Sequence, residues 1–243
     1  MIKIKNITDL NRKNKKAVFL GCGQSISNLS KEKYQNLKKE YDIWANNSFF
    51  VHPFIIPDFY HLEIKLHRNG NLFKDYFPKV KNKFKDTCFI TDSHHSYVFD
   101  LVSPKEFNMY TYQHYDRNKD HARYDVHPFY VASSGSSLSR ILDIIVRMGY
   151  KEISFLGVDL YDSRYFWTDK KEYENIIVDD IIKTCKPDEQ DPDEKHQTYF
   201  TVDYLNSLSS YQYIKNGIIF KNLSSKSLLN QIKDNKAFKH EYI

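Results

Sequence analysis

Short apolar segments alternate with longer amphipathic or polar segments along most of the chain. Residues 16–20 form an apolar run that ends at Gly21, and residues 41–45 form a second run. Between the two runs, Ser30 is suited to cap a helix, because its hydroxyl can accept a hydrogen bond from a free N–H of the first turn. This order of strand, turn, helix and strand predicts a βαβ unit with a right-handed crossover.

The period becomes helical after Ser136. Apolar side chains recur at positions i, i+3, i+4 and i+7, at Leu138, Ile141, Leu142 and Ile145. Gly149 suits the left-handed position that ends such a helix, and the apolar run at 153–156 predicts a strand that ends at Gly157. Together with the first unit, this pattern predicts an α/β fold with a mostly parallel sheet and helices on both of its faces.

The rest of the chain gives weaker patterns. Further strands are expected at 57–61, 88–91, 107–112 and 217–220, and further helices at 199–213 and 225–232. The order of elements between residues 65 and 120 is not predicted. The polar segment 170–195 predicts a mobile loop, because its composition can bury little apolar surface. No linker is evident, so residues 1–243 are expected to form a single domain.

Composition narrows the class of protein. Hydrophobic residues make up 41% of the 243, and the net charge is +5, with basic clusters in 2–16 and 79–85. Such clusters favour anionic partners, a phospholipid face included, whereas no nucleic-acid-binding motif is present. Three cysteines without a CxxC pair and the lack of a spanning apolar run predict a cytoplasmic protein, with peripheral contact at the inner face of the membrane left open.

Glycine is scarce and is placed beside the predicted strands. Of seven glycines, four lie at strand ends or at a helix start, namely Gly21, Gly23, Gly135 and Gly157. Open α/β sheets bind their ligands outside the carboxyl ends of their strands, so these turns are candidate ligand contacts. The turn from Gly21 to Ser25 could offer its backbone N–H groups to a phosphate, but Ile26 replaces the third glycine of a dinucleotide fingerprint.

Three further groups of residues are candidates for ligand binding or catalysis. The serines around Ser134 and Gly135 precede a helix, whose N-terminus suits a carboxylate or a phosphate. Tyr161 and Tyr165 follow a strand end, and their neutral phenols can donate to a departing phosphate. His196 can act as a general base near neutral pH.

No metal site is predicted from the sequence. His94 and His95, and the pair His121 and His127, lack a convincing set of partner ligands. The Asp-x-Asp at residue 191 lies in a run of solvated charges.

These segments together resemble a known family. The Gly-x-Gly-x-Ser turn, Asn46 and the stretch SGSSLSRILDIIVRMGYKEISFLGVDLY at 134–161 resemble the bacterial sialyltransferases of glycosyltransferase family 42, and residues 222–229 resemble that family's C-terminal element. The resemblance covers most of the chain and is weakest between residues 50 and 131.

The resemblance implies transfer of sialic acid from CMP-sialic acid to a glycan or glycolipid, as in lipooligosaccharide biosynthesis. It implies a Rossmann-like fold of a GT-A-like variant, a small lid at 168–196, and no metal or other cofactor. Ser134 and Gly135 would hold the sugar carboxylate, Tyr161 and Tyr165 would stabilise the leaving phosphate, and His196 would be the base. The other donor-binding residues would be Gly21, Cys22, Gly23, Ser25, Asn46, Gly157 and Asp159.

Three departures from the family pattern keep alternatives open. Cys22 and His61 stand where asparagine is common, and Val131 stands where the family has arginine. A different nonulosonate, such as Kdo or legionaminic acid, therefore remains a candidate donor sugar. A nucleotide-dependent dehydrogenase or epimerase, a catalytically silent nucleotide-sugar-binding module, and a homo-oligomeric state also remain open.

Overall fold

A computed structural model describes residues 4–63, 70–95, 97–116, 124–125, 130–133, 136–160, 165–167, 171 and 192–243. Within these residues the main sheet has nine strands, and every pairing in it is parallel. Its order across the sheet is β1 (Lys5–Asn6), β6 (Asn108–Tyr112), β5 (Cys88–Asp92), β4 (Phe59–Leu62), β3 (Tyr41–Asn46), β2 (Lys16–Leu20), β9 (Glu152–Leu156), β10 (Ile219–Asn222) and β11 (Phe238–His240). A separate parallel pair joins β7 (His114–Asp116) to β8 (Val131–Ser133).

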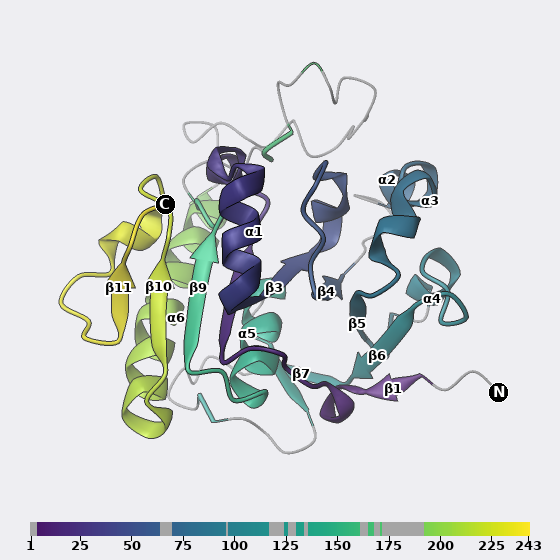
Figure 1. Cartoon of the computed structure of the whole chain (residues 1–243). Coiled ribbons are helices and arrows are strands. Elements are labelled where there is room, and N and C mark those ends of the chain that lie inside the picture. Colours follow the sequence, from purple (N-terminus) through teal and green to yellow (C-terminus); the bar gives the residue numbers. More distant parts are fainter. Residues whose placement is uncertain are drawn as a thin grey trace.

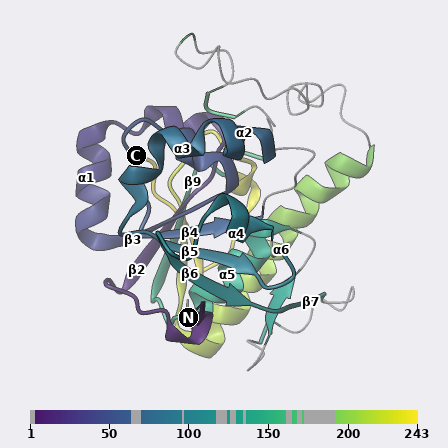
Figure 2. The same ribbon diagram turned by 90° about the vertical axis from the view of Figure 1, so that its right-hand side faces the viewer.

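Helices cover both faces of this sheet, as Figures 1 and 2 show. The α-helices are α1 (Lys31–Glu40), α2 (Gly70–Asp75), α3 (Phe77–Val80), α4 (Val98–Leu101), α5 (Ser137–Arg147) and α6 (Pro192–Asn216). The 3₁₀ helices are η1 (Ile7–Asp9), η2 (Gln24–Asn28), η3 (Asn47–Val51), η4 (Lys81–Phe84) and η7 (Leu228–Gln231). None of the helices described is both long and apolar enough to cross a membrane.

The alternation of side chains along each strand produces two hydrophobic cores. Val18 and Leu20 of β2 face the core that α1 and α3 cover, whereas Ala17 and Phe19 face the core that α5 and α6 cover. All four side chains are buried, since both faces of the strand are covered. This explains why β2 reads as a continuous apolar run, as is typical of parallel sheets.

The local signals in the sequence agree with the helix ends. The hydroxyl of Ser30 accepts a hydrogen bond from the N–H of Lys33 at 3.2 Å, which confirms the predicted cap of α1. Ser136 caps α5 in the same way, and Gly149 has a φ of 75°, the left-handed conformation expected after that helix. The predicted α/β fold with a mostly parallel sheet is thus confirmed.

Several boundaries differ from the prediction. The helix expected at 199–213 begins at Pro192, inside the segment expected to be a loop, because proline suits the first turn of a helix, where no N–H is needed. The helix expected at 225–232 is only a 3₁₀ turn at Leu228–Gln231. Strands β1, β7, β8 and β11 have two or three residues each, too few for a period to be seen in the sequence.

The connectivity reverses beside β2. From β2 the chain adds β3, β4, β5 and β6 on one side, and then returns to place β9 and β10 on the other side. In open α/β sheets, ligands bind outside the carboxyl ends of the strands at such a switch point. The fold therefore predicts a ligand site at the carboxyl ends of β2 and β9.

One histidine of β4 is enclosed by the fold. His61 has no exposed surface, its Nε2 lies 2.7 Å from the hydroxyl of Tyr112, and its Nδ1 has no hydrogen-bond partner among the described residues. Burial lowers the pKa of His61 from 6.5 to about 4. The imidazole is therefore neutral in the folded protein at pH values where it is charged in the unfolded chain.

We expect this histidine to make the protein less stable in acid. Since its pKa is lower in the folded state, the stabilisation is complete above pH 6.5 and is lost as the pH falls towards 4. The loss should reach about 3 kcal/mol. Urea unfolding of the wild type and of His61→Gln between pH 4 and 7 should show a shallower pH dependence in the variant. Parallel curves for the two proteins would contradict the assignment.

Candidate functional site

The register of the central strands brings three predicted donor-binding residues to one level. Leu156 of β9 pairs with Leu20 of β2, and Leu20 pairs with Ala45 of β3. The residues that follow are Gly157, Gly21 and Asn46, so they lie side by side at the carboxyl edge. Each strand thus contributes the residue immediately after its last buried apolar side chain to the switch point of the sheet.

Gly157 and Gly21 approach each other so closely that no side chain fits between them. A Cβ atom at Gly21 would lie 2.3 Å from the carbonyl oxygen of Gly157, and one at Gly157 would lie 2.4 Å from that of Gly21. Gly157 also has a φ of 73°. The N–H of Gly21 donates to the carbonyl of Leu156 at 2.8 Å, and that of Gly23 to the carbonyl of Gly157 at 2.8 Å. Glycine is therefore required at these turns by contact between backbones.

A buried carboxylate holds the first turn in place. Asp159 is 2% exposed, accepts a hydrogen bond from the backbone N–H of Ser25 at 2.8 Å, and accepts another from the Ser25 hydroxyl at 2.5 Å. That hydroxyl in turn accepts from the N–H of Gly157 at 3.2 Å. Ser25 and Asp159 were expected to contact the donor; the structure places them beneath the turns, where they fix the glycine backbones.

The segment 165–167 lies against the same turn. The backbone of Tyr165 forms a bridge with Gly23, and the N–H of Phe166 donates to the carbonyl of Cys22 at 2.8 Å. The half-buried ring of Tyr165 stacks on the buried ring of Trp167, with 4.4 Å between the ring centroids. Tyr165 is therefore held beside the glycine turn, and its role in the reaction stays a prediction.

Cys22 and Asn46 also lie beside the glycine turns. Burial raises the pKa of the Cys22 thiol to about 12, so the thiol stays protonated at neutral pH and cannot act as an anionic nucleophile. The side chain of Asn46 is half-buried and has no hydrogen-bond partner within the described part of the chain. Its amide is therefore the polar group at this edge that is most available to a ligand.

The first turn of α5 is already paired with a carboxylate. Glu63, which follows β4, accepts a hydrogen bond from the hydroxyl of Ser137 at 2.5 Å and forms an ion pair with Arg140 at 3.1 Å. Both partners of this ion pair are largely buried. The contact ties the end of β4 to the start of α5 and so fixes where the helix begins.

Several predicted residues lie outside the described part of the chain. These are Ser134, Gly135, Tyr161 and the side chain of His196, together with most of the expected lid at 168–196. His196 falls within α6, whose backbone is described. Their roles stay predictions.

The structure also brings together a group that the sequence did not reveal. Asp92 lies at the end of β5, with His94 two residues later and His114 at the start of β7. Burial alone would raise the pKa of Asp92, but hydrogen bonds from His94 and His114 outweigh it and lower the pKa. His94 was expected to lack partners; the equal spacing of Asp92 and His94, and of Tyr112 and His114, is the signal that could have revealed this group.

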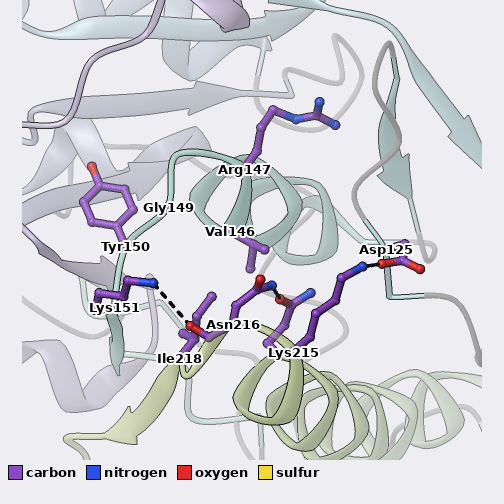
Figure 3. Close-up of a pocket in the computed structure, with 10 residues that line it drawn as sticks. Asp125, Val146, Arg147, Gly149, Tyr150, Lys151, Lys215, Asn216 and Ile218 are labelled. Atoms are coloured by element: carbon purple, nitrogen blue, oxygen red, sulfur yellow. Dashed lines mark hydrogen bonds and ion pairs between the residues drawn. The ribbon is translucent and has the colours of Figure 1, made fainter.

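A hollow of about 300 Å³ lies at the opposite end of the strands, where β9 and β10 begin. Figure 3 shows it between the C-terminal ends of α5 and α6, with Arg147, Lys151 and Lys215 among the residues that line it. The two lysines shown are already engaged, Lys151 by the carbonyl of Asn216 at 3.3 Å and Lys215 by Asp125. None of the predicted donor-binding residues lines this hollow, so it is not the predicted site.

No protein-family model matches the sequence, and no curated protein is significantly similar to it. Among solved structures, the chain is similar to the monofunctional alpha-2,3-sialyltransferase Cst-I from Campylobacter jejuni, with a TM-score of 0.54 and 12% identity over 94% of this chain and 82% of that chain. It is also similar to the sialyltransferase CstII from Campylobacter jejuni in complex with the substrate analogue CMP-3FNeuAc, with a TM-score of 0.46 and 12% identity over 89% and 84% of the two chains. The likeness to Cst-I shows a shared fold.

The close approach at Gly157 can be separated from its backbone conformation by a matched pair of variants. Gly149 has nearly the same φ, 75°, but nothing lies within 4 Å of a Cβ placed there. We expect Gly149→Ala to cost about 1–2 kcal/mol, the penalty for the left-handed conformation alone. Gly157→Ala should cost about 1–3 kcal/mol more, because the backbone of Gly21 must move away. Urea unfolding measures both values, and equal losses would contradict the close contact.

Proposed function

We propose that the protein is a glycosyltransferase that moves a sialic acid or a related nonulosonate from a CMP-activated donor to a glycan. The observation that carries the proposal is the alignment of Gly157, Gly21 and Asn46 at the switch point of a sheet with the fold of Cst-I. These are residues for which the sequence resemblance implies donor contact.

The glycine turns lie at the position that suits a nucleotide, at the carboxyl ends of the strands beside the switch point of the sheet. The side-chain positions of Gly21 and Gly23 are filled by the backbone of Gly157 and, at Gly23, by the carboxylate of Asp159, so these glycines fix the shape of the turns beneath a ligand. The amide of Asn46 can both donate and accept hydrogen bonds, as recognition of a ribose or a base requires. Ser134 and Gly135 would bind the sugar carboxylate near the start of α5.

The transfer needs two kinds of help from the protein. The bond to the phosphate breaks as positive charge develops on the sugar, so donors near the phosphate stabilise the transition state. We assign this role to the phenols of Tyr161 and Tyr165. The acceptor hydroxyl must also lose its proton, and we assign that step to His196 on α6. The phenols donate to the departing CMP without a metal ion, so we propose that this step is metal-independent.

The acceptor side rests on the family resemblance alone. We propose a glycan or glycolipid of the lipooligosaccharide type, reached from the cytoplasmic face of the membrane. The lysine-rich segments, residues 2–16 and 79–85, would support a peripheral contact with an anionic surface. The lid at 168–196 would close over the bound donor.

Two alternative functions would use the turn from Gly21 to Ser25 differently. A dinucleotide-dependent dehydrogenase or epimerase places its pyrophosphate at the N-terminus of the helix that follows the glycine turn. Here a 3₁₀ segment, η2, follows the turn, and α1 begins only at Lys31. This disfavours dinucleotide binding. A catalytically silent module would bind CMP without turning over the donor.

A ligand screen tests the donor class. CMP at about 100 times its dissociation constant should stabilise the protein by ~2.7 kcal/mol, which corresponds to roughly 5–10 °C in Tm for a chain of this size. UDP, GDP and NAD should stabilise it much less. Thermal unfolding with each nucleotide measures the difference. Equal shifts with CMP and UDP would overturn the CMP proposal, and a dominant shift with NAD would favour the dehydrogenase.

Variants of two residues separate the two catalytic roles. His196→Ala should slow transfer by about 10²-fold or more while donor hydrolysis by water and CMP binding change little, because the base faces the acceptor. Tyr165→Phe should slow both transfer and hydrolysis, since it removes a donor to the leaving group. Radiolabelled donor and product analysis measure both rates. Near-normal transfer in His196→Ala would exclude this histidine as the base.

A further inference from the structure

The registers of β5 and β6 align two pairs of polar side chains. Asp92 of β5 pairs with Tyr112 of β6. After Asp92 the chain turns, with the N–H of His95 donating to the carbonyl of Asp92 at 3.0 Å, and this turn carries His94, whereas His114 begins β7 two residues after Tyr112. The rings of the two histidines lie with their centroids 5.9 Å apart. The pairing of β5 with β6 thus brings His114 to Asp92, and the turn after β5 brings His94 to it.

The two histidines converge on one carboxylate. Nδ1 of His94 lies 2.8 Å from Oδ1 of Asp92, and Nδ1 of His114 contacts Oδ2. One ligand atom from each of the three residues can be chosen so that all lie within 4.8 Å of one another. Asp92 is fully buried and also accepts a hydrogen bond from the backbone N–H of His94 at 2.9 Å, which orients the carboxylate.

We propose that Asp92, His94 and His114 bind a divalent transition-metal ion, with Zn²⁺ as the first candidate. Two imidazoles and one carboxylate are a common set of protein ligands for zinc, and a water molecule would complete the tetrahedron. Zn–ligand bonds of about 2.0 Å place neighbouring ligand atoms about 3.3 Å apart. Both contacts must therefore widen, that of Asp92 with His94 by about half an ångström and the shorter one with His114 by more, and the exposed His94 ring can provide its part.

The surroundings favour a cation at this position. Neutral histidines carry no formal charge, so Asp92 gives the three ligands a total charge of −1. The nearby Arg140 already forms an ion pair with Glu63. Because Glu63 balances its charge, the guanidinium of Arg140 competes less with the metal ion for Asp92. The carboxylate that binds the metal is enclosed by protein, whereas the side chain of His94 is 65% exposed, so an ion can enter from the side of His94.

The metal would lie away from the glycine turns. Three strand spacings of about 4.8 Å separate β5 from β2, so the cluster lies roughly 14 Å from the glycine turns. The metal would be separated from the glycine turns by β4 and β3. It would instead join the end of β5 to the junction of β6 and β7 at the same edge of the sheet. The inference therefore stands independently of the proposed function.

Direct metal binding by the full-length chain tests the proposal. The protein is stripped with a chelator, dialysed against Zn²⁺ and analysed by elemental mass spectrometry, and a Co²⁺ titration follows the visible absorption of a tetrahedral site. We expect one Zn²⁺ per chain. His94→Gln and His114→Gln should each weaken binding at least tenfold, and His240→Gln, which changes a histidine on β11, should leave it unchanged.

Because Asp92 is buried, Asp92→Asn could unfold the protein, and the exposed His94 is therefore the decisive position. His94→Gln with native circular dichroism, an unchanged Tm without metal and no increase in Tm with Zn²⁺ would support the site. Less than 0.2 equivalents of Zn²⁺ in the wild type, or equal binding by wild type and His94→Gln, would overturn it. Donor hydrolysis in chelator is measured in parallel: its loss would count against the metal-independent departure of CMP, whichever way the binding result falls.

Discussion

The contact between the backbones of Gly21 and Gly157 joins the two halves of the sheet at its carboxyl edge. Without side chains between them, β2 and β9 end in turns that share hydrogen bonds, and Asp159 fixes both turns through Ser25. The position of the half-buried Tyr165 depends on the same turns, since its backbone pairs with Gly23. The proposed donor site is therefore an arrangement of main chain held from below by one buried carboxylate.

The sequence predicted the elements whose pattern is long enough to be seen. Strands β2, β3 and β9 are apolar on both faces, and α5 shows an unbroken apolar stripe, so their existence and order could be inferred. The short helices α2 and α3 could not, because aromatic side chains such as Phe73 and Phe77 pack there by tertiary contact rather than by a regular period. The start of α6 at Pro192 was hidden by its polar composition.

The sequence predicted the glycines of the candidate site but not the contacts that support them. A glycine after a buried strand signals close approach whatever the partner is, but only the register of β2 with β9 identifies Gly157 as that partner. The burial of Asp159 and its pairing with Ser25 join residues 134 positions apart. The cluster at Asp92 was missed for the same reason, since the pairing of β5 with β6 brings His114 to it.

The switch in connectivity beside β2 also governs how the chain folds as it is made. Lys16 of β2 pairs with Glu152 of β9, so about 136 residues must be synthesised before the central pair of strands can form. At ~5–20 residues per second, the apolar edge of β2 stays unpaired for roughly 7–27 s on the ribosome. Strands β2 to β6 can assemble during this time, but they present an open edge to other nascent chains. We therefore expect production of the protein to be sensitive to chaperone supply and to the rate of translation up to β9.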